Sequence, residues 1–206
     1  MNRKIGIAKV FILVLLVVTF LTGCGGNDMQ SENIVSPEDD LNNFSKIIGE
    51  ENLDGFRLII YYMNPFILTR MPLSVDNLIY GITAINEPPR EKNDVNGLYE
   101  QKFVITGSQL EEHIDLFTQI GKIDLIPVEK ESYINVRIYY MFESEKDGKI
   151  FDVALWGGYD ENSMFVNGTE VKENAVFYEA ILPFLPENYA LDLKNYIAGI
   201  WPGVSE

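Results

Sequence analysis

The stretch YINVRIYYMFESEKDGKIFDVALW, residues 133–156, predicts a β-hairpin, and this hairpin sets the class of the fold. Its arms carry alternating side chains and meet at residues 145–148, Glu-Lys-Asp-Gly. A tight two-residue turn would oppose the like charges of Glu143 and Asp152, so we expect a type I turn with Gly148 in a left-handed bulge. That register pairs Phe142 with Phe151, Tyr140 with Val153, and Ile138 with Leu155.

Other segments extend this pattern into an antiparallel sheet flanked by helices. Asn167-Gly168 predicts a second hairpin over Met164–Val171. Ser108 and Glu111 are spaced as a capping box, so a helix is expected to begin at Ser108 and to stop at Gly121. The class is therefore α+β. Further expected elements are strands at Phe56–Met63 and Tyr99–Thr106, a helical turn at Ser74–Ile79, a long loop at Glu87–Gly97, and helical segments at Asn174–Leu185 and Glu187–Ala198 broken at Pro183 and Pro186.

The N-terminus has the layout of a secretory signal. Three basic residues precede an apolar run over Val10–Phe20, which is too short to span a bilayer. Leu21-Thr22-Gly23-Cys24 follows and resembles the lipobox of bacterial lipoproteins. The resemblance implies cleavage after Gly23 and diacylglycerol on the sulfur of Cys24. It places the protein on the outer, extracytoplasmic face of the cell membrane, and the whole chain looks like the small envelope lipoproteins of low-GC, single-membrane bacteria. An ordinary signal peptide with an incidental cysteine, or an uncleaved anchor, is the alternative.

The rest of the chain reads as a tether followed by one domain. Residues 1–23 form the signal, residues 24–52 a polar tether, and residues 53–200 a single domain with a core of its own. A short amphipathic helix at Glu38–Ile48, from Pro37 to Gly49, is expected within the tether. Since three of the 16 basic residues lie in the signal and all 31 acidic residues follow it, the mature chain has a formal charge of −18. Nucleic acid is therefore not an expected partner.

The residues that carry common catalytic chemistry are scarce. The chain has one cysteine and one histidine, His113, which helical spacing places on the packed face of its helix. No cofactor motif is found, and the best match to a calcium loop has Lys92 and Phe103 where carboxylates are needed. We expect no metal site and no cofactor, although an acidic cation-binding domain is a further alternative.

The outer face of the main hairpin is the predicted recognition surface. In the bulged register Trp156 lies opposite Arg137, and Tyr139 and Tyr159 complete an aromatic and cationic patch. The alternative is that the C-terminal helices cover this face. We expect a non-catalytic module that binds a protein, a peptide or a neutral glycan there. The second hypothesis is a small surface hydrolase that uses paired carboxylates such as Asp152 and Asp160.

Overall fold

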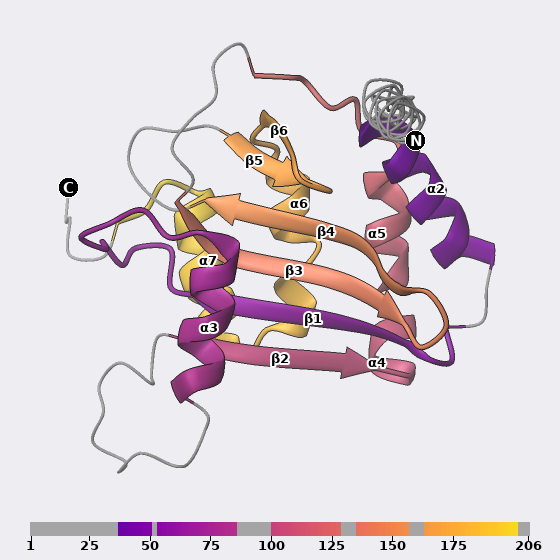
Figure 1. The fold of residues 1–206 in the computed structure, drawn as a ribbon, viewed down its shortest axis with the longest axis horizontal. Coiled ribbons are helices and arrows are strands. Elements are labelled where there is room, and N and C mark those ends of the chain that lie inside the picture. The colour runs from indigo at the N-terminus through magenta and orange to yellow at the C-terminus, as the bar shows by residue number, and fades with distance from the viewer. Residues whose placement is uncertain (1–36, 51–52, 86–99, 129–134, 157–162, 202–206) are drawn as a thin grey trace, which may run out of the picture. The chain divides into compact units, whose positions relative to one another are not determined.

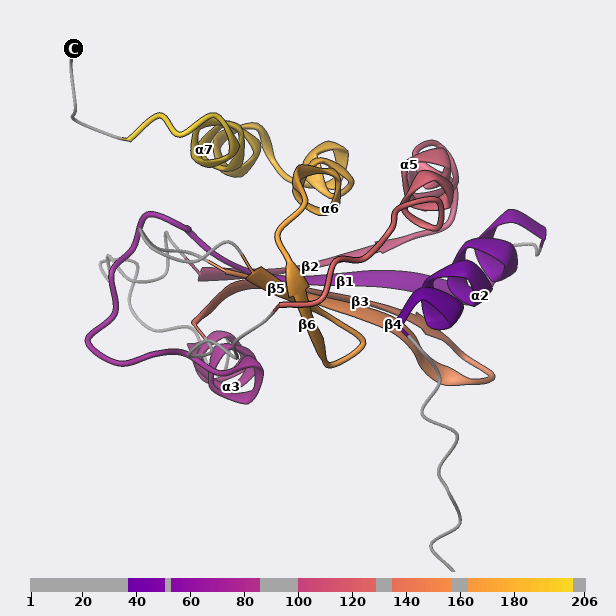
Figure 2. The ribbon, with the colours of Figure 1, turned by 90° about the horizontal axis from the view of Figure 1, so that it is seen from above.

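The computed structural model describes residues 37–50, 53–85, 100–128, 135–156 and 163–201. They form one antiparallel sheet of strand order β2-β1-β3-β4-β5-β6, with helices on both faces (Figures 1 and 2), which confirms the α+β class. The strands are β1 (Phe56–Met63), β2 (Glu100–Thr106), β3 (Val136–Ser144), β4 (Gly148–Trp156), β5 (Ser163–Val166) and β6 (Thr169–Lys172). The strand expected at Phe56–Met63 is confirmed, and so is the one ending at Thr106.

The central hairpin β3–β4 has the predicted register over most of its length. Phe142 pairs with Phe151, Tyr140 with Val153, and Ile138 with Leu155, while Gly148 has a φ of 72° at the bulged turn. A second irregularity between Val136 and Ile138 was not predicted. It sets Trp156 opposite Val136, so the predicted pairing of Trp156 with Arg137 is wrong.

The hairpin β5–β6 is confirmed in position and register. Met164 pairs with Val171 and Val166 with Thr169, leaving Asn167 and Gly168 as the two turn residues. Their φ angles are 46° and 78°, the left-handed conformation that a type I′ turn requires at both positions.

The first face of the sheet holds the main core, and most of the helices lie over it. Figure 2 shows α5 (Ile114–Ile120), α6 (Ala175–Glu179) and α7 (Glu187–Ile197) on one side of the strands, and α3 (Val75–Ile85) on the other. Aromatic rings fill the first face: Phe117 meets Phe142 edge-on at 4.7 Å. The hydroxyl of Tyr140, also on this face, donates to the carbonyl of Phe177 in α6 at 3.1 Å. The C-terminal helices therefore cover the first face, and the alternative in which they cover the second is wrong.

The helix α2 (Pro37–Glu50) belongs to this core, although the sequence assigned it to the tether. Leu41, Phe44 and Ile48 are almost fully buried, and Phe44 stacks on Phe151 with ring centroids 4.2 Å apart. The predicted boundary at residue 53 is therefore corrected to about residue 37. Helix α2 also contacts the end of α5 so closely that a Cβ at Gly121 would collide with Ser45.

The predicted capping box at Ser108 does not form. Helix α4 (Ser108–Glu111) has Gly107 at its cap, with a φ of 58° and no side-chain cap hydrogen bond. The chain then breaks at His113 and continues as α5, which ends before Gly121 as expected. His113 is half-buried against the ring of Phe184, at 5.5 Å, consistent with a packing role.

The remaining helices follow their expected segments, with local differences. Asn174 caps α6 by accepting from the amide of Val176, and a short 3₁₀ turn (η2, Leu182–Phe184) precedes α7. Helix α3 extends to Ile85, beyond the predicted helical turn at Ser74–Ile79. The signal, Cys24, the tether before residue 37 and the Glu87–Gly97 loop lie outside the described residues. Within the described part of the chain, no helix is both long and apolar enough to cross a membrane.

Candidate functional site

The second face of the sheet is covered at one end by α3 (Figure 2). Polar residues, among them Asp76 of α3 and Asp152 of β4, line a groove on this face. Leu78 and Ile82 of α3 pack on a small apolar cluster of this face. The bulge in β3 brings Val136 into the cluster together with Tyr139. The strand residues of the cluster are Ile59, Tyr61, Met63, Val136, Tyr139 and Ala154.

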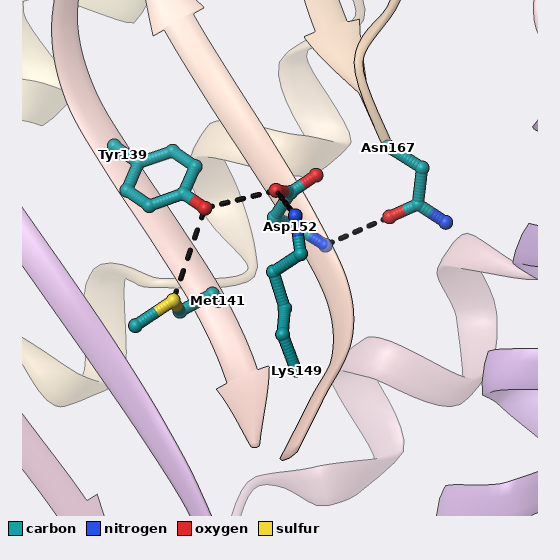
Figure 3. A network of polar contacts seen from close by, with 5 residues as sticks. All are labelled: Tyr139, Met141, Lys149, Asp152 and Asn167. Atoms are coloured by element: carbon teal, nitrogen blue, oxygen red, sulfur yellow. Dashed lines mark hydrogen bonds and ion pairs between the residues drawn. The ribbon is translucent and has the colours of Figure 1, made fainter. Parts of the chain in front are cut away.

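Asp152 lies at the centre of the polar network on this face (Figure 3). The hydroxyl of Tyr139 donates to its Oδ2 at 2.8 Å, and the Lys149 ammonium contacts the same oxygen at 2.5 Å. The Asp152 side chain is only 12% exposed, whereas the Lys149 side chain is 54% exposed. Both donors therefore hold one carboxylate oxygen in a fixed position.

The turn of the β5–β6 hairpin fixes the backbone of Asp152. The amide of Asp152 donates to Oδ1 of Asn167 at 2.9 Å, and the amide of Asn167 donates to the carbonyl of Asp152 at 2.9 Å. The Asn-Gly turn thus shapes its own hairpin and also positions the carboxylate on the neighbouring strand. Figure 3 shows Asn167 approaching β4 from the side opposite Tyr139.

An open groove of about 420 Å³ runs beside this network, between the start of α3 and the turn at Gly168. Its lining combines apolar and polar side chains. Among the described residues, none donates a hydrogen bond to the second carboxylate oxygen of Asp152, Oδ1. The groove is lined by Ser74, Val75, Asp76, Val136, Tyr139, Lys149, Asp152, Ala154, Phe165 and Gly168.

The Tyr139 hydroxyl acts as a neutral donor. Burial, together with the neighbouring Asp152 carboxylate, raises the pKa of Tyr139 well above its ordinary value. The phenol therefore stays protonated at ordinary pH and keeps donating to Asp152. The arrangement can present an oriented acceptor to a ligand, and it offers no activated nucleophile.

Arg137 does not contribute to an exposed patch. It is 1% exposed, and its guanidinium donates to the carbonyl of Ile67 at 3.0 Å, to Oγ1 of Thr69 at 3.0 Å, and to Oδ1 of Asn135 at 2.6 Å. Burial lowers its pKa from the ordinary value. The prediction that Arg137 belongs to a surface site is corrected: it holds the segment after β1 in place.

Of the two predicted site residues whose side chains the structure describes, Arg137 and Tyr139, Tyr139 is the one that lines the groove. Trp156 lies at the end of β4 opposite Val136, while Tyr159 and Asp160 lie outside the described residues. Asp152, which the sequence suggested only as one of a catalytic carboxylate pair, was not included in the predicted patch, and neither were Asp76 and Lys149. The predicted register already places Asp152 opposite Met141 and diagonal to Tyr139, a spacing at which side chains interact.

Comparison with family models, curated proteins and solved structures finds no match for this chain. The groove is therefore interpreted from its own geometry. Across the described ranges, no three His, Cys, Asp or Glu residues are grouped so that they could hold a metal ion.

Proposed function

We propose that the protein is a lipid-anchored, extracytoplasmic binding module, and that the groove beside Asp152 holds its ligand. The observation that supports this proposal is the oriented carboxylate, with Oδ2 fixed by Tyr139 and Lys149 and Oδ1 without a donor from the described residues. Oδ1 faces an open groove, where a donor from a ligand can form a charge-assisted hydrogen bond with the carboxylate. The groove thus favours a ligand that carries a hydroxyl, an amide N–H or an ammonium group.

The charge of the groove favours a neutral or cationic ligand. Two carboxylates, Asp76 and Asp152, and one ammonium, Lys149, line it. The formal charge of the whole chain is −15, which repels anionic polymers such as nucleic acids. The apolar wall residues suit the flat face of a sugar ring or an aliphatic side chain. A peptide segment, a partner domain or a neutral glycan meets these requirements.

Hydrolysis by a carboxylate pair is the second candidate function. Asp76 lines the same groove as Asp152, and paired carboxylates are the usual catalysts of glycoside hydrolysis. The contacts of Asp152 with Tyr139 and Lys149 argue for a holding role, because they keep its Oδ2 occupied. Binding without catalysis therefore remains the proposal.

The groove is tested by photo-crosslinking in intact cells. A benzoylphenylalanine at Phe165, which lines the groove, should form a discrete adduct. The control places the same group at Val104, which is 52% exposed on β2, away from the groove. Asp152→Asn in the Phe165 background should reduce the adduct several-fold, since the carboxylate that orients the ligand is lost. Equal adducts at both positions, or none at Phe165, would exclude a groove ligand.

The anchor is tested separately by metabolic labelling with an alkyne fatty acid. The wild-type chain should be labelled, and Cys24→Ser should not be, because the thioether that carries diacylglycerol cannot form. The serine variant should also leave the membrane fraction or keep its signal. Labelling that persists in Cys24→Ser would end the lipoprotein proposal and leave the groove proposal standing.

A further inference from the structure

A second pocket lies at the end of α7, where the chain reverses. Gly199 adopts a φ of 69°, its amide donates to the carbonyl of Tyr196, and the amide of Ile200 donates to that of Asn195. This turn brings Trp201 back toward the helix. Phe66 meets the rings of both Trp201 and Tyr196 edge-on, at 5.0 Å and 5.8 Å, so the two aromatic side chains lie close together.

The pocket has a volume of about 280 Å³ and shares no lining residue with the groove. Three of its lining residues are aromatic, and the rings of Tyr178 and Tyr196 are 5.9 Å apart. Glu173, which is half-buried, is the charged residue among those that line it. It is lined by Glu173, Ala175, Tyr178, Tyr196, Ile197, Gly199 and Trp201.

We propose that this pocket binds a quaternary ammonium group. Aromatic rings attract such cations through their negative faces, by about 0.5–2 kcal/mol per contact, and a carboxylate adds a direct Coulomb attraction. Its volume of about 280 Å³, near the lower end of the range for small-molecule sites, is sufficient for a group the size of trimethylammonium. The negative charge of the whole chain acts in the same direction, and an anion would be repelled by Glu173.

The buried guanidinium of Arg137 is the basic group whose charge reaches Tyr196. It does not line the pocket, and its N–H groups already bond to Ile67, Thr69, Asn135 and Val136. Its repulsion of a second cation is therefore a fixed cost that all cationic ligands share. It lowers the affinity for a cation relative to a neutral molecule of the same shape, and the Glu173 carboxylate, which lines the pocket itself, acts in the opposite direction.

Choline and its neutral isostere 3,3-dimethylbutan-1-ol are the probes. Each is titrated into the detergent-solubilised full chain by calorimetry, in a maltoside detergent that carries no choline. Choline should bind at least about tenfold more tightly than the isostere, which corresponds to about 1.4 kcal/mol. Glycerophosphocholine identifies the source of the cation: tighter binding than choline assigns a lipid headgroup, and weaker binding a free quaternary amine.

Three variants make this comparison specific to the pocket. Glu173→Gln and Trp201→Leu should each weaken choline binding about five- to tenfold while leaving the isostere unchanged. Asp152→Asn, in the separate groove, should bind choline as the wild type does, and Tyr196→Phe keeps the ring and should bind it too. Equal affinity for choline and the isostere, or no choline binding by a chain whose circular dichroism is native, would overturn the proposal.

Discussion

The two faces of the sheet differ in what they bury. The first face buries the main apolar core, in which Phe142 and Phe151 of the sheet pack against Phe44 of α2. The second face buries an apolar cluster only beneath α3, and next to it lies the network of Tyr139, Lys149 and Asp152 (Figure 3). The same strands thus supply a core on one side and a polar groove on the other.

This difference separates stability from recognition. Apolar packing on the first face gives most of the free energy of folding, since each buried large side chain contributes about 1.5–3 kcal/mol. Buried polar groups on the second face contribute less on balance, because their hydrogen bonds replace bonds to water. Changes on the first face should therefore unfold the domain, and changes on the second should mainly alter binding.

Removal of α2 tests the first face most severely. A chain that starts at residue 53 loses Leu41, Phe44 and Ile48, about 5–9 kcal/mol of burial, which approaches the whole stability of a typical domain. A chain that starts at Val35 keeps the compact unit and should unfold cooperatively in urea. The shorter chain should show no cooperative transition by circular dichroism. If both chains unfold cooperatively at the same urea concentration, α2 is dispensable and the core of the first face does not depend on it.

The stability of the domain at alkaline pH shows how well each of the two faces excludes water. Burial raises the pKa values of Tyr62, Tyr139 and Tyr140, so the stability that these phenols confer is complete below about pH 10 and falls at higher pH, where the unfolded chain loses its protons first. The loss should be at most about 1.4 kcal/mol per tyrosine per pH unit. Urea titrations between about pH 9 and 11.5 measure it.

Two single variants show how much of this decrease in the free energy of unfolding with pH comes from each face. Tyr140→Phe, on the first face, should reduce the slope by close to one tyrosine, and Tyr139→Phe by no more than that, since Tyr139 borders the open groove. If Tyr139→Phe leaves the slope unchanged, water reaches its hydroxyl. The second face would then be more hydrated than the 6% exposure of Tyr139 indicates.

The variant Arg137→Met tests the irregularity in β3 between Val136 and Ile138, which interrupts the alternation of side chains between the two faces. The variant leaves the carbonyl of Ile67 without its donor and should cost about 2–3 kcal/mol in urea denaturation. Arg57→Met is the matched control, because the Arg57–Glu143 ion pair is largely exposed and should contribute less than about 1 kcal/mol. Equal effects of the two changes would show that the Arg137 hydrogen bonds only offset the cost of burying its charge.

Local sequence signals predicted the hairpins because each turn depends on its own residues. Gly148 and the Asn167-Gly168 pair require left-handed backbone, and that requirement determines the registers of both hairpins. The irregularity at Val136 has no such signal. It depends on how Arg137 meets Ile67 and Thr69, which come from a different part of the chain.

The candidate site was only partly predictable for the same reason. Alternation along β3 placed Tyr139 on the second face correctly, but the bulge removed Arg137 from the site. Asp152 was recoverable from the predicted register as a diagonal neighbour of Tyr139. The contribution of Asn167 was not, since it depends on β5 pairing beside β4. Helix α2 was misassigned because its short apolar stripe has no local sign of the partner that buries it.

The stacking of Phe44 on Phe151 also sets the order in which the fold can assemble. Helix α2 is among the first parts of the domain to be synthesised, yet its partners in α5 and β4 come much later in the chain. Contacts between such distant segments form slowly, because a long loop must close before any burial compensates for its entropy. We therefore expect the first face to close late in folding, once β4 has joined the sheet.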